Sequence, residues 1–193
     1  MRIASTRRFF QMAFACACLF TALSAAAALQ ATDAIDDAVP MFNARVERYV
    51  RLRARLEDPL PSFDQRRDPW SLMLTRRYLA SAIRTARLSA HQADIFTPPV
   101  AQLFRGLIAD AIYDVDIEGL VDEDREAAGF VVDVVVNEPV PAWALQDVPD
   151  ALRGRLPALP DAIEYRVVDG NLILWDTHAE IVIDALPNAF LVQ

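Results

Sequence analysis

The acidic run at 114–126 has the highest density of side chains that could do chemistry. Aligned with a twelve-residue calcium loop, it has acidic residues at positions one, three, five and nine, and glycine at position six. Those candidate calcium ligands are Asp114, Asp116, Glu118 and Asp122. Position twelve, where a glutamate normally supplies two oxygens, is Arg125. The run therefore predicts a degenerate calcium loop at most, and a solvated acidic connector is the simpler interpretation.

Two histidines are the other candidates for acid–base or metal chemistry. His178 lies between Asp176 and Glu180, an arrangement that could help bind a metal or transfer protons. No second histidine lies nearby in the sequence, so we interpret His178 as a solvated turn residue. His91 falls near the end of a predicted helix, where a cation would favour the negative end of the helix dipole.

Covalent catalysis finds little support in the composition. All 19 basic residues are arginine, so Schiff-base and P-loop lysine chemistry are excluded. Both cysteines, Cys16 and Cys18, lie in the apolar N-terminal run, and no serine has the G-x-S-x-G context. Carboxylate pairs for hydrolysis can form by chance among so many acids. We therefore expect no cofactor and no catalytic residue.

Residues 1–28 have the pattern of a secretory signal. Arginines precede an apolar run from Phe9 to Leu23, and small residues follow it. We expect cleavage near Ala28, a flexible leader over 29–39, and no membrane-spanning segment afterwards. The predicted location is the periplasm or the exterior.

Charge is unevenly distributed along the rest of the chain. Residues 45–105 contain 12 arginines and 6 acids, whereas residues 106–193 contain 4 arginines and 18 acids. The two halves most simply attract each other across one core. A nucleic-acid partner is disfavoured by the acidic pI of about 4.7 and by the export signal.

Hydrophobic periodicity predicts three helices in residues 40–113. They span about 40–57, 69–92 and 98–113, and Asp68-Pro69 and Thr97-Pro98 provide starts for the last two. Arg53 falls on the apolar stripe of the first helix and is expected to extend outward. Trp70, Leu74 and Tyr78 are expected to widen the buried face of the second. Short connectors favour an antiparallel bundle.

Strand patterns dominate residues 129–187, after the acidic connector at 114–128. The valine-rich segment Phe130–Val136 predicts a buried strand. Asp169-Gly170 between two apolar runs predicts a tight hairpin, and a further strand is expected near 180–185. The fold class is therefore α+β, with a three-helix region packed on a small, mainly antiparallel sheet in one domain over 40–193.

Two segments suggest relatives. The segment ADIFTPPVAQLFRGLI at 93–108 resembles a family of uncharacterised exported bacterial proteins, which implies a compartment but no activity. The segment at 163–186 is similar to the closing hairpin of the RcnB-like periplasmic proteins, a family associated with nickel and cobalt homeostasis. The histidine-rich tract expected for that role is missing from this sequence.

These observations favour an exported, non-catalytic protein that binds an envelope partner or a small ligand. The alternatives are an exported hydrolase that uses carboxylates and a degenerate calcium-binding protein.

Overall fold

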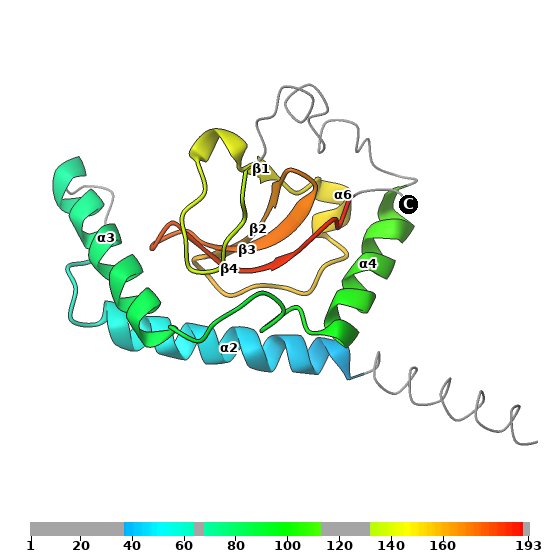
Figure 1. The fold of residues 1–193 in the computed structure, drawn as a ribbon, viewed down its shortest axis with the longest axis horizontal. Coiled ribbons are helices and arrows are strands. Elements are labelled where there is room, and N and C mark those ends of the chain that lie inside the picture. Colours follow the sequence, from blue (N-terminus) through cyan, green and yellow to red (C-terminus); the bar gives the residue numbers. More distant parts are fainter. Residues whose placement is uncertain (1–36, 64–67, 113–131, 191–193) are drawn as a thin grey trace, which may run out of the picture. The chain divides into compact units, whose positions relative to one another are not determined.

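The computed structural model describes residues 37–63, 68–112 and 132–190. All of these except Asp37 belong to one unit that begins at Ala38. The calcium candidates Asp114, Asp116, Glu118 and Asp122 lie outside the described residues. Element labels follow Figure 1.

In the described part of the chain three helices come first: α2 (Ala38–Glu57), α3 (Pro69–Ala86) and α4 (Pro98–Ile112). The predicted start of α3 is confirmed, because the Asp68 carboxylate accepts hydrogen bonds from the backbone N–H groups of Trp70 and Ser71. Pro69 occupies the first turn, where its missing N–H costs nothing.

A four-stranded antiparallel sheet follows, in the order β1-β2-β3-β4. Its strands are β1 (Gln146–Asp147), β2 (Ile163–Val168), β3 (Asn171–Asp176) and β4 (Ile181–Leu186). The predicted hairpin is present: Val168 pairs with Asn171, and both Asp169 and Gly170 have positive φ. A short 3₁₀ helix η2 (Ala142–Ala144) and a short helix α6 (Asp150–Arg153) flank β1. The α+β class, with helices first and sheet last, is confirmed.

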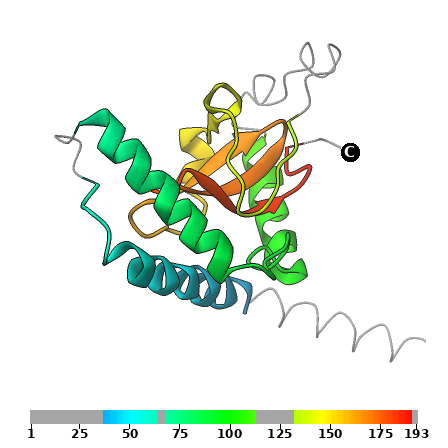
Figure 2. The ribbon, with the colours of Figure 1, turned by 60° about the vertical axis from the view of Figure 1, so that its left-hand side comes forward.

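The helices frame the sheet instead of forming an antiparallel bundle. Helix α2 runs along one side of the sheet, and α3 and α4 lie at its two ends, each packed on α2 (Figures 1 and 2). The expected bundle is therefore wrong, because the apolar faces of the helices are buried largely against the strands.

Both faces of the sheet are buried. The larger core fills the space between the helices and one face, and includes Phe42, Phe104, Val167 and Leu174. A smaller core on the other face is covered by the segment 132–145. Residues Ile181–Leu186 are all buried as a result, although the sheet is antiparallel.

The predicted strand at Phe130–Val136 is not found in its described part. Residues 132–135 are irregular, and only Asn137 and Glu138 bond to β4, through Val182. Pro139 then follows and has no N–H to continue the ladder. Val132 and Val134 instead pack over the smaller core, which explains the apolar composition of this segment.

Two expectations about helix faces are also wrong. Trp70 and Tyr78 are 64% and 66% exposed, because α3 buries a narrower stripe and its first turns point away from the sheet (Figure 1). Arg53 is buried instead of extended, and its guanidinium lies 2.7 Å from Glu57. The sequence pattern does not predict this burial, because the other groups around Arg53 come from the distant β3–β4 turn.

Candidate functional site

A pocket of about 360 Å³ lies between α2 and the segment after α3, and four of the described arginines line it. We call it the arginine pocket. It is lined by Arg45, Arg48, Tyr49, Leu52, Arg55, Arg87, Asp94 and Ile95. On α2 the lining residues 45, 48, 52 and 55 are spaced by three, four and three positions, which places them on one face of the helix.

Two of the four guanidinium groups are anchored. Arg45 donates from Nη1 to the backbone oxygen of Asp94. Arg87 donates from Nη1 to Asn137 Oδ1 over 2.7 Å and from Nη2 to the Ile183 oxygen over 3.1 Å. The Asn137 amide returns a bond to the Arg87 carbonyl. The positive charge of Arg87 is thereby held in one place.

Arg87 is also largely desolvated. Its guanidinium carbon lies 5.0 Å from the centroid of the Tyr49 ring, a cation–π contact. Burial lowers the pKa of Arg87, and the nearby Tyr49, Asp94 and Asp184 oppose that shift. The guanidinium is therefore partly withdrawn from water, and Asp94 and Asp184 offset part of the cost of its charge.

Within residues 37–63, 68–112 and 132–190, no carboxylate lies in an ion pair with any of the four pocket arginines. The next arginines of α2 are different, because Arg51 pairs with Glu47 at 3.2 Å and Arg53 with Glu57. Asp94, the one acid among the described residues that line the pocket, lies 3.1 Å from His91. The pocket therefore has the electrostatics of an anion site.

Beneath the pocket, buried polar groups fix its floor. Tyr49 donates from its hydroxyl to Asp176 Oδ2 over 2.6 Å, and Asp176 also accepts the N–H groups of His178 and Ala179. Burial and the Asp176 charge raise the pKa of Tyr49 well above its ordinary value of 10.0. These bonds hold Tyr49 against the strands and so position the face of α2 that carries the arginines.

His178 is packed rather than solvated, contrary to the expectation. Its ring stacks on Phe63 with centroids 4.5 Å apart, and its side chain is 33% exposed. Nδ1 lies 2.9 Å from both Glu57 Oε1 and Arg53 Nη1. Among the residues that the structure describes, no group of three potential ligands could hold a metal ion.

Asp184 is a second buried carboxylate, which the sequence analysis did not single out. It accepts hydrogen bonds from the N–H groups of Ala93, Ile95, Phe96 and Ala185. Burial raises its pKa, and these four bonds oppose the rise. Because Ala93 to Phe96 lead from α3 into α4, Asp184 fixes the loop that forms one wall of the arginine pocket.

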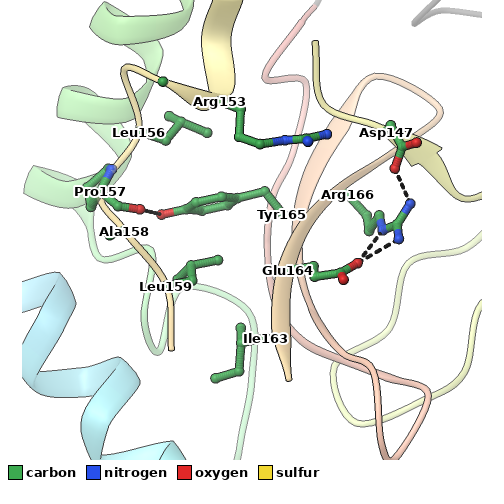
Figure 3. A pocket seen from close by; sticks show the side chains of 11 residues that line it. Asp147, Arg153, Leu156, Pro157, Ala158, Leu159, Ile163, Glu164, Tyr165 and Arg166 are labelled. Atoms are coloured by element: carbon green, nitrogen blue, oxygen red, sulfur yellow. Dashed lines mark hydrogen bonds and ion pairs between the residues drawn. The ribbon is translucent and has the colours of Figure 1, made fainter. Parts of the chain in front are cut away.

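A larger pocket of about 640 Å³ lies beside β2 (Figure 3). Leu156, Leu159 and Tyr165 provide apolar surface there, and the Tyr165 hydroxyl donates to the Pro157 oxygen over 2.9 Å. The Arg166 guanidinium at its rim is paired with both Asp147 and Glu164. Since the Arg166 charge is compensated within the protein, this rim offers less unpaired charge to a ligand than the arginine pocket does.

The arginine pocket is only partly visible in the sequence. The spacing of Arg45, Arg48 and Arg55 indicates a basic helix face. Arg87 lies beside that face only because the folded chain brings the end of α3 next to α2. His91, expected within a helix, follows the end of α3 and is exposed beside Asp94.

No family model, curated protein or solved structure matches the chain. In the described part of the chain, no helix combines the length and the apolar character needed to cross a membrane.

Proposed function

We propose that this protein is an exported, non-catalytic binding protein whose arginine pocket holds an anionic ligand. The observation that carries the proposal is the gathering of four guanidinium groups without an ion-paired carboxylate in the described chain. Arginine presents planar, forked donors that match phosphate and carboxylate groups. A bound anion would add to the partial compensation that Asp94 and Asp184 give the Arg87 charge.

The positions of the buried acids favour binding over carboxylate-dependent hydrolysis. Asp176 and Asp184 are 0% exposed, and both accept hydrogen bonds from backbone N–H groups. Their geometry fits a structural role in holding a turn and a loop. A general acid or base must reach the proton that it transfers, and neither carboxylate has solvent access.

Binding can be tested by titrating purified protein with inorganic pyrophosphate at constant ionic strength. Calorimetry should detect binding, and Arg48→Gln with Arg55→Gln should weaken it about tenfold or more, since each charge-assisted contact contributes about 1.5–3 kcal/mol. Arg51→Gln is the matched control, because Arg51 is on the same helix, exposed and paired with Glu47. Equal sensitivity to both changes would place binding elsewhere.

Export is tested separately. N-terminal sequencing of the protein from an envelope or culture fraction should begin between Ala27 and Leu29. An intact Met1 in that fraction would mean that the apolar run remains as an anchor.

A further inference from the structure

The positive charges of the arginine pocket are spread along α2. Arg45 and Arg55 are ten residues apart, which corresponds to about 15 Å along a helix that rises 1.5 Å per residue. Arg48 lies between them on the same face. A row of this length exceeds what one small anion can contact at once.

The anchoring of two arginines keeps the charges apart. Arg45 is bound to the Asp94 carbonyl, and Arg87 is bound to Asn137 and Ile183. Neither guanidinium can move toward the other without losing these bonds. Arg48 and Arg55 are exposed and have no hydrogen-bond or ion-pair partner within the described residues, so they can follow a ligand.

We propose that the arginine pocket binds a linear polyanion, in which several phosphate-like groups lie along α2, one or two to each arginine. The inference rests on the proposed anion-binding function and specifies its ligand class. Binding of this kind releases counterions and falls steeply with salt. For four contacts to a flexible chain, the logarithm of the affinity should fall by about 3 per tenfold increase in salt.

The pocket favours a polyanion without bases over a nucleic acid. Single-stranded nucleic acids gain much of their affinity when bases stack on aromatic side chains. Among the described lining residues Tyr49 alone is aromatic. Tyr49 is 4% exposed, and the Arg87 guanidinium lies over its ring. The exposed rings of Trp70 and Tyr78 belong to α3 and do not line the pocket.

The test compares the affinities of orthophosphate, tripolyphosphate and long-chain polyphosphate, measured by calorimetry at one pH and constant ionic strength. Affinity should rise at least tenfold from orthophosphate to the long chain, after correction for the number of phosphate groups. Arg45→Gln and Arg55→Gln, at the two ends of the row, should each lower long-chain affinity about tenfold. Arg51→Gln should change it less than twofold, and the thermal midpoint of each variant checks that it is folded.

The outcomes separate this inference from the proposed function. If orthophosphate binds as tightly as the long chain, the inference of a polyanionic ligand is wrong, whereas the proposed anion-binding function is supported. If no phosphate of any length binds, both fail. If a single-stranded oligonucleotide of equal charge binds more than tenfold tighter than polyphosphate, the ligand is a nucleic acid and the inference is overturned.

Discussion

Tyr49 and Asp176 are joined by a 2.6 Å hydrogen bond although they lie 127 positions apart in the sequence. Tyr49 is 4% exposed and Asp176 is 0% exposed, so water cannot replace either partner. The bond fixes the middle of α2 to the end of β3. It also holds the ring over which Arg87 is placed, and so connects the sheet to the arginine pocket.

Tyr49→Phe should therefore lower the free energy of unfolding by about 1–3 kcal/mol, because it removes one donor from a buried carboxylate. Chemical denaturation measures this loss. Tyr78→Phe is the control, since Tyr78 is 66% exposed and its change should stay within about 0.5 kcal/mol. If the two variants are equally stable, the Tyr49 hydroxyl contributes nothing to the fold.

Asp184→Ala should be more damaging. The change leaves four backbone N–H groups without their acceptor, and each buried unsatisfied donor costs about 1–3 kcal/mol. Removing a charge whose pKa is raised by burial offsets part of this cost. We expect a net loss of about 2–4 kcal/mol in urea denaturation, whereas Asp161→Ala, at an exposed position, should have little effect. Wild-type stability in Asp184→Ala would contradict the proposed anchoring of the 93–96 loop.

Gly170→Val should destabilise the β2–β3 hairpin by about 1 kcal/mol or more. Gly170 has φ of 73°, which a β-branched residue tolerates poorly. Gly154 offers the control: its φ is −67°, and an added Cβ would lie 3.8 Å from the backbone oxygen of Asp150, an ordinary van der Waals contact. Gly154→Ala should therefore be neutral or slightly stabilising. Thermal denaturation of both variants decides whether the turn conformation matters.

Local signals in the sequence predicted the elements of the fold better than their arrangement. Asp68-Pro69 starts a helix and Asp169-Gly170 closes a hairpin because each depends only on neighbouring backbone groups. The valine-rich pattern predicts burial but not a strand, because an irregular segment that covers a sheet, as residues 132–135 do, is buried as well.

The candidate site was harder to predict because its contacts are non-local. Arg53 fits the apolar stripe of α2 only because His178, 125 residues away, and Asp176 surround its guanidinium. Arg87 reaches the pocket because Asn137 and Ile183 fix its side chain. Periodicity along one helix contains no information about such partners.

Calcium should have little effect on stability. The candidate ligands Asp114, Asp116, Glu118 and Asp122 lie outside the described residues, and Arg125 stands where the loop needs its bidentate acid. Millimolar calcium at constant ionic strength should leave the thermal midpoint unchanged. A rise of several degrees that magnesium does not reproduce and that Asp114→Ala abolishes would show a genuine calcium site, by mass action on the folded state.

Alkaline pH should unfold the protein through two buried phenols. Burial raises the pKa values of both Tyr49 and Tyr165 above their ordinary value of 10.0. Above pH 10 the unfolded chain loses these protons while the folded chain keeps them, so stability falls as pH rises. Each phenol contributes a slope of up to about 1.4 kcal/mol per pH unit. Phenolate absorbance from both residues should therefore appear together with the loss of helical circular dichroism.

Tyr165→Phe tests the contribution of one phenol. The slope of the unfolding free energy against pH should be about half as steep in this variant as in the wild type. If phenolate forms from both residues while the helices remain folded, these side chains are not sealed in the core.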